Sequence, residues 1–160
     1  MRTLYPQERF AVPTPLGVTL VVQAAGGAIN AAGFARIRSA RRERPKTALL
    51  REAVKQIDAY FAKRLRRFDL PLSFEGTAFQ LDVWRFVARL EFGEIVSYSD
   101  VARIVGRPGA HRGVARAMSE SPMELFVPAH RVVGADGTVR GAGPQSMRRR
   151  LLAFEGIRLR

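Results

Sequence analysis

The sequence predicts an α+β protein of two domains: a small N-terminal α/β domain with an antiparallel sheet, and a mainly helical C-terminal domain that carries a helix-turn-helix. Three observations lead to this class. Residues 1–44 contain short apolar runs separated by Pro and Gly turns, and residues 47–64 change to a helical period. After Pro71, helical segments alternate with capping and Gly/Pro signals. We place the domain boundary between residues 72 and 73, in a connector that Pro71 keeps extended.

The N-terminal part is expected to form three strands, over residues 10–12, 18–22 and 34–38. Turns are expected at residues 13–17 and at Gly26-Gly27. In the third strand, apolar residues alternate with basic or polar ones, which is typical of a half-exposed antiparallel sheet. The helix that follows has an apolar face made of Leu50, Val54, Ile57 and Phe61.

Two capping boxes predict helix starts in the C-terminal part. Thr77 and Gln80 form the first, before a helix whose core stripe comprises Phe79, Val83, Phe86, Val87 and Leu90. Ser97 and Asp100 form the second, before a helix built on Val101, Ala102, Ile104 and Val105. The last helix is predicted over residues 145–154, with Gly156 at its end. Its basic run, Arg148 to Arg150, is read as a solvated face.

A helix-turn-helix is predicted between residues 101 and 118. Residues 106–109 break one helix, and a short helix of small residues and arginines starts near Ala110. Arg112 and Arg116 lie four residues apart and therefore share a face. The pattern fits an ordinary helical hairpin with a solvated basic face equally well, and only the net charge favours DNA.

That charge is the strongest global signal. The chain has 27 Lys and Arg against 14 Asp and Glu, a formal net charge of +13. Such an excess is typical of nucleic-acid binding; an arginine-rich composition inherited from a thermophilic or GC-rich source is the alternative, and a membrane surface ranks third. The absence of cysteine excludes disulfides, thiolate zinc sites and cysteine nucleophiles. With only two histidines, we expect no metal and no cofactor. The chain lacks a membrane-length apolar run, so we expect a cytoplasmic protein, associated with the nucleoid when on DNA, and no membrane partner.

Residues 126–133 are the stretch most suggestive of a functional pocket. An apolar run with a Pro is followed by His130 and Arg131 and then by β-branched residues. A buried segment of this kind delivers a polar pair to the floor of a pocket. The residue directly before His130, where a nucleophile would be expected, is Ala129.

Several spaced motifs occur together in a fixed order. They are the helix and connector of residues 48–71, Gly76-Thr77-x-Phe79-Gln80-x-x-Val83-Trp84, Phe92-Gly93-Glu94, Ser97-Tyr98, Arg112-x-Val114, Pro128-x-His130-Arg131-Val132 and Leu151-Leu152-x-x-Glu155-Gly156. In these motifs the chain resembles the O(6)-alkylguanine-DNA alkyltransferase family. The resemblance implies a ribonuclease H-like α/β domain over residues 1–72 and a DNA-binding alkyltransferase-type domain over residues 73–160. It also implies double-stranded DNA containing O(6)-alkylguanine as the partner.

The resemblance also implies roles for individual residues. Arg112 matches the arginine that replaces a guanine swung out of the duplex, because its planar guanidinium fills a base-sized gap. The DNA-binding set is Tyr98, Ser99, Ala110, His111, Arg112, Gly113 and Arg116. The lesion pocket comprises Tyr98, Met118, Ser121, Ala129, Val132, Gly141, Ala142 and Gly143. His130 and Glu155 match a relay that deprotonates a cysteine thiol for attack on the alkyl carbon.

In that family the cysteine belongs at position 129, where this chain has Ala129. Direct alkyl transfer is therefore excluded, and His130 and Glu155 become remnants of the relay. Ser121 replaces an Asn that braces the nucleophile loop, and residues 140–144 contain no tyrosine where the family lid has one. These linked departures favour a natural alkyltransferase-like protein over an engineered substitution.

We therefore expect a monomeric, non-enzymatic protein that binds the minor groove, flips O(6)-alkylguanine into a pocket and signals its repair, with nucleotide excision repair proteins as expected downstream partners. The alternative is a suicidal methylated-DNA–protein-cysteine methyltransferase represented by a Cys-to-Ala inactive variant. A helix-turn-helix regulator of undamaged DNA is a third interpretation, ranked last because the sequence shows no dimerisation stripe.

Overall fold

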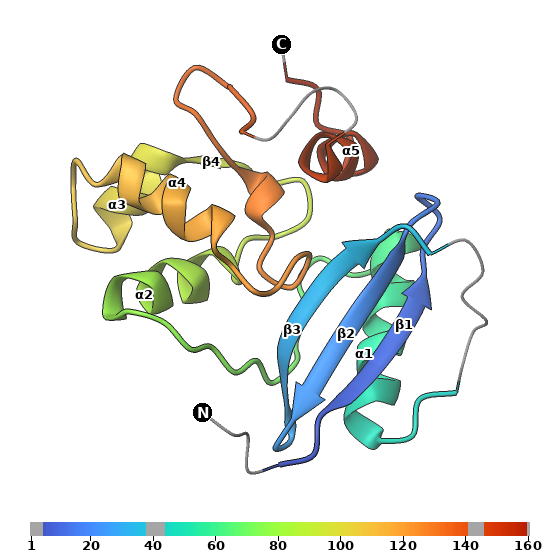
Figure 1. The fold of residues 1–160 in the computed structure, drawn as a ribbon. Helices are drawn as coiled ribbons and strands as arrows, with labels where there is room; N and C mark the ends of the chain where they lie inside the picture. Colours follow the sequence, from blue (N-terminus) through green and yellow to red (C-terminus); the bar gives the residue numbers. More distant parts are fainter. Residues whose placement is uncertain (1–4, 38–43, 141–145, 160) are drawn as a thin grey trace. The chain divides into compact units, whose positions relative to one another are not determined.

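The protein has the predicted α+β class, with an antiparallel sheet in its N-terminal part and a helical C-terminal part (Figure 1). The computed structural model describes residues 5–37, 44–140 and 146–159. Its contacts divide the chain into two compact units. Unit 1 comprises residues 1–74 and 122–126, and unit 2 comprises residues 75–121 and 127–160.

Unit 1 is a sheet of three antiparallel strands packed on one helix. The strands are β1 (Glu8–Pro13), β2 (Thr19–Ala25) and β3 (Ala28–Ala35), in the order β1-β2-β3. Alternate residues of each strand are buried, and helix α1 (Ala48–Phe61) lies along one face of the sheet (Figure 1). The Thr47 side chain accepts from the Leu50 amide and caps this helix.

The predicted bounds of the third strand were wrong. It begins at Ala28 directly after the Gly26-Gly27 turn and ends at Ala35, whereas the sequence predicted residues 34–38. The start of the real strand is rich in Ala and Gly and lacks the β-branched residues that indicate strands. The tight turn nevertheless returns the chain along β2, so pairing with β2 decides the conformation. Residues 38 and 39 lie outside the described residues.

A second passage of the chain completes unit 1. Residues 122–126 run beside β3, where the Ala32 amide donates to the Pro122 carbonyl at 3.0 Å and the Glu124 amide donates to the Ala32 carbonyl at 2.9 Å. Met123 is fully buried, and the Phe126 ring meets that of Phe68 edge to face at 5.0 Å. The sequence gave no indication of this return.

Unit 2 contains the helices α2 (Ala78–Val87), α3 (Tyr98–Ile104), α4 (His111–Ser119) and α5 (Met147–Phe154). Both capping threonine and serine side chains accept the amides that were predicted, since Thr77 caps α2 in a complete capping box and Ser97 caps α3. Trp84 of α2 is buried, and its Nε1 donates to the Ala117 carbonyl of α4 at 2.8 Å. Helices α3 and α4 pack on each other across the Gly106–Ala110 turn.

Some residues predicted for the core of unit 2 are less buried than expected. Phe79 and Phe86 are half-buried, because the buried face of α2 runs through Val83, Trp84 and Val87. Ile104 is 53% exposed, since α3 ends there and buries only its earlier residues. Among the described residues, no helix is both long and apolar enough to cross a membrane.

Candidate lesion-recognition site

The floor of the candidate site is set by a short parallel pairing. Strand β4 (Val96–Ser97) leads into α3, and strand β5 (Val132–Val133) follows the 3-10 turn η1 (Ala129–Arg131). Val96 pairs with Val132 and Ser97 with Val133. The pairing brings the start of α3, where Tyr98 lies, next to the chain that leaves η1. Ala129 is half-buried at the start of η1, while His130 and Arg131 are buried.

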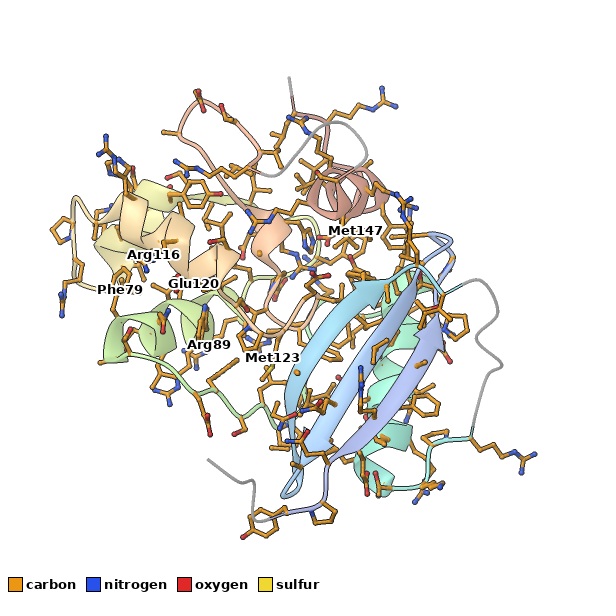
Figure 2. The ribbon with its side chains drawn as sticks, viewed as in Figure 1. Phe79, Arg89, Arg116, Glu120, Met123 and Met147 are labelled. Carbon is orange, nitrogen blue, oxygen red and sulfur yellow. The ribbon has the colours of Figure 1, made fainter. Side chains whose placement is uncertain are left out.

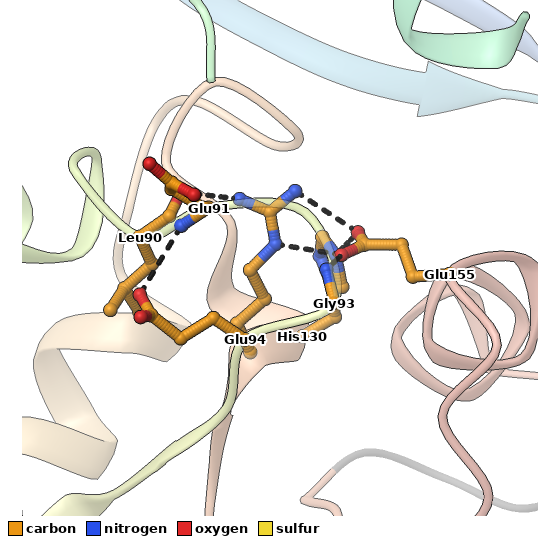
Figure 3. A network of polar contacts seen from close by, with 7 residues as sticks. Leu90, Glu91, Gly93, Glu94, His130 and Glu155 are labelled. Atoms are coloured by element: carbon orange, nitrogen blue, oxygen red, sulfur yellow. Dashed lines mark hydrogen bonds and ion pairs between the residues drawn. The ribbon is translucent and has the colours of Figure 1, made fainter. Parts of the chain in front are cut away.

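The carboxylate of Glu155 is the centre of a buried polar network (Figure 3). It accepts from the Arg131 guanidinium at 2.9 Å and 3.2 Å, from the Gly93 amide at 2.8 Å, and contacts Nε2 of His130. Arg131 also donates to the Leu90 carbonyl at 2.6 Å. Glu155 caps the C-terminus of α5, and Gly156 follows with a φ of +80°, so the predicted helix end is confirmed.

The electrostatics of this network define its protonation. Burial lowers the pKa of His130, which outweighs its contact with Glu155, so the imidazole is neutral at pH 7. Burial alone would raise the pKa of Glu155, but the hydrogen bonds and positive charge from His130 and Arg131 lower it to about 2. An ionised Glu155 therefore accepts the proton-bearing Nε2 of His130, which leaves Nδ1 as the nitrogen that accepts a proton. A general base is assembled beside Ala129, a residue with nothing to deprotonate.

Helix α4 carries the predicted DNA-binding residues on its exposed face. His111, Arg112 and Arg116 are exposed, as is Ser99 of α3, while Ala110 and Gly113 are half-buried. Arg116 donates to Glu120 at 2.9 Å, and Glu120 also accepts from Gln80 at 2.7 Å (Figure 2). The ion pair raises the pKa of Arg116 through its hydrogen bond with Glu120. Glu120 thus ties this face of α4 to the capping box of α2.

The predicted pocket residues differ in their surroundings. Met118 and Val132 are buried in unit 2, and Ser121 is half-buried at the end of α4. Tyr98 is only 6% exposed, and its buried hydroxyl has no hydrogen-bond partner among the described residues. The guanidinium of Arg140 lies 5.7 Å from the centre of the Tyr98 ring. Gly141, Ala142 and Gly143 lie outside the described residues.

Beside this pocket, unit 2 contains a basic hollow of about 460 Å³, which the sequence did not predict. The residues that line it are Arg112, Ala115, Arg116, Ser119, Arg140 and Arg148. The basic run of α5 is therefore half-buried rather than the solvated face that its sequence suggested, and Arg148 faces this hollow. In the described part of the chain, no three His, Asp or Glu side chains are grouped as metal ligands.

Comparison with known proteins gives consistent matches. The family model described as 6-O-methylguanine DNA methyltransferase, DNA binding domain, matches residues 78–157, and the model for its ribonuclease-like domain matches residues 11–74. A methylated-DNA–protein-cysteine methyltransferase of Methanosarcina barkeri is 40% identical over 111 residues, covering 69% of this chain and 70% of the relative. The counterpart in Mycobacterium leprae is 44% identical over 99 residues, covering 62% and 60%.

Solved structures match over nearly the whole chain. A crystal structure of the Mycobacterium tuberculosis O6-methylguanine methyltransferase is 32% identical with a TM-score of 0.80, covering 94% of this chain and 93% of that one. A structure of the protein from the same organism in complex with DNA is 34% identical with a TM-score of 0.77, covering 92% and 91%.

Proposed function

Because the chain belongs to the O6-methylguanine DNA methyltransferase family and contains no cysteine, we propose that it recognises O6-alkylguanine in DNA without removing the alkyl group. The named relatives transfer a methyl group to a protein cysteine. Such a transfer needs a thiolate, and a methyl side chain at position 129 supplies no nucleophile. The observation that carries the proposal is a buried His130–Glu155 pair beside Ala129.

The exposed face of α4 is the proposed DNA-binding surface. Arg112 and Arg116 are exposed on it, and the chain carries a net charge of +13. A solved relative that is 34% identical was crystallised with DNA, which supports the same partner here. In this proposal α4 enters the minor groove, and Arg112 takes the place of the extruded base.

The proposed pocket for the flipped base lies around Tyr98, Met118, Ser121, Ala129 and Val132. The buried Tyr98 hydroxyl lacks a partner among the described residues and is available to an incoming polar group. Ala129 leaves room where a reacting side chain would project. The lesion is held rather than converted, and the bound complex signals to another repair system. Nucleotide excision repair proteins are the proposed recipients, and the chain acts as a monomer.

Titration of matched DNA duplexes tests this proposal. Gel-shift measurements with guanine or O6-methylguanine at one position should show clearly tighter binding to the lesion, and equal affinities would refute lesion recognition. Arg112→Ala should weaken binding to the lesion more than Arg51→Ala. Arg51 is an exposed arginine on α1 of unit 1 and is therefore a matched control for charge. Arg148 is unsuitable as a control because it lines the basic hollow.

A second candidate function is that of a suicidal methyltransferase whose nucleophile has been lost. The complete Glu155 network favours it, because the general base that a thiol would need is still assembled. Ala129→Cys with a DNA substrate carrying radiolabelled methyl groups separates the two candidates. Rapid stoichiometric labelling of the protein would support this second function. Tight lesion binding with no labelling would support recognition alone.

A further inference from the structure

The basic hollow of unit 2 is built from three separate segments. Arg112 and Arg116 come from α4, Arg140 from the chain after β5, and Arg148 from α5. Ala115 and the Ser119 hydroxyl complete its lining. Its volume of about 460 Å³ lies within the range of small-molecule sites. Four arginines from different elements converge here on one space.

The charges around this hollow are poorly balanced. Arg116 is paired with Glu120, but no carboxylate of the described residues pairs with Arg112, Arg140 or Arg148. Gathered guanidinium groups repel one another, and an anion placed among them relieves that repulsion. The planar donors of arginine also bind a carboxylate or phosphate through two parallel hydrogen bonds. The hollow therefore favours an oxyanion as its occupant.

Arg140 connects the hollow to the proposed lesion pocket. It lines the hollow, and its guanidinium also lies 5.7 Å from the centre of the Tyr98 ring. The Arg140 carbonyl accepts from Nη1 of Arg148 at 3.5 Å, which links the positions of the two arginines. A base held against Tyr98 would thus place a substituent within reach of positive charge.

Resting on the function proposed above, we propose that this hollow is an anion subsite that selects O6-alkylguanines whose alkyl group ends in a carboxylate. Arg140 and Arg148 donate to the carboxylate, and the Ser119 hydroxyl supplies a further donor. A phosphate of the DNA backbone offers the same oxyanion chemistry. It is present in every duplex, however, so it would strengthen binding to all lesions equally and would not discriminate between adducts.

The test compares duplexes that differ only at one guanine. They carry guanine, O6-methylguanine, O6-carboxymethylguanine or its neutral amide, O6-(2-amino-2-oxoethyl)guanine, which matches the acid in size. The acid should bind about tenfold more tightly than the amide, because hydrogen bonds to a charged group are stronger than those to a neutral one. Fluorescence anisotropy at fixed salt measures all four dissociation constants.

Variants assign the preference to the hollow. Arg140→Gln and Arg148→Gln should each reduce the ratio of acid to amide affinity, whereas the exposed Arg51→Gln of unit 1 should leave the ratio unchanged. Equal affinities for acid and amide would overturn the subsite, as would an Arg140→Gln variant that weakens all four duplexes equally, which would assign the hollow to backbone phosphate. If O6-methylguanine binds no better than guanine, the lesion-recognition proposal itself fails, so the two failures are distinguishable.

Discussion

Replacing Glu155 by Gln tests whether the buried network holds unit 2 together. The substitution keeps the size of the side chain but removes its charge. The carboxylate accepts from two nitrogens of Arg131 and from the Gly93 amide, and it contacts His130 (Figure 3). A glutamine presents one oxygen and one NH₂ group to these donors, so at least one donor then faces another donor. Arg131 would remain buried without its counter-charge.

The expected cost is large. Removing one partner of a buried ion pair destabilises a protein by about 3–5 kcal/mol. The pKa gives a second route to the magnitude, because lowering the pKa of Glu155 from 4.5 to about 2 corresponds to about 3 kcal/mol in favour of the ionised form. For a chain of 160 residues, a loss of about 3–5 kcal/mol lowers the melting temperature by roughly 6–20 °C.

The single tryptophan makes the measurement specific to unit 2. Trp84 is buried in α2, so its fluorescence during urea unfolding reports on the unit that contains Glu155. Glu75→Gln is the matched control, since Glu75 is exposed and lies in the same unit. A Glu155→Gln variant that loses less than about 1 kcal/mol would refute the reasoning, because it would place the pair among weak surface interactions.

Three further predictions follow from local structure. Acidification should destabilise the protein: burial lowers the pKa of His130 below 6.5, and His130 and Arg131 hold that of Glu155 at about 2, so the unfolded chain binds more protons. Stability is then complete above about pH 6.5, falls below it, and falls further between pH 4.5 and about 2; a melting temperature unchanged from pH 7 to 4 would contradict this. Gly76→Ala should cost about 1–3 kcal/mol in urea unfolding, because the new Cβ would lie 2.9 Å from the Trp84 ring; unchanged stability would show that the ring moves aside. Thr77→Ala should cost about 0.5–2 kcal/mol through the lost cap of α2, measured by the same unfolding, and a neutral result would mean that water replaces the cap.

Features held within a few residues could be predicted from the sequence. The helix starts at Thr77 and Ser97 depend on hydrogen bonds to amides three residues on, and the end of α5 depends on Gly156. The spaced motifs likewise indicated the family, because they depend on residue type and order alone. The class and the helices of both parts were therefore accessible without coordinates.

Contacts between distant residues could not be predicted in this way. Arg131 was noticed only as the neighbour of His130, yet it binds Glu155, 24 residues away, and the Leu90 carbonyl, 41 residues away. The basic hollow depends on where α5 lies relative to α4, so Arg148 looked like an ordinary solvated residue until the fold placed it. The strand start at Ala28 was missed because pairing with β2 overrides the weak strand preference of Ala and Gly.

The return of residues 122–126 to β3 makes the order of synthesis matter. A ribosome that has made residue 74 has produced every strand and the helix of unit 1, but Ala32 still lacks the partners of its amide and carbonyl, which come from Pro122 and Glu124. At about 5–20 residues per second, the missing segment emerges roughly 3–10 s later. The first unit of the nascent chain therefore waits with an open sheet edge until most of the second unit has been made.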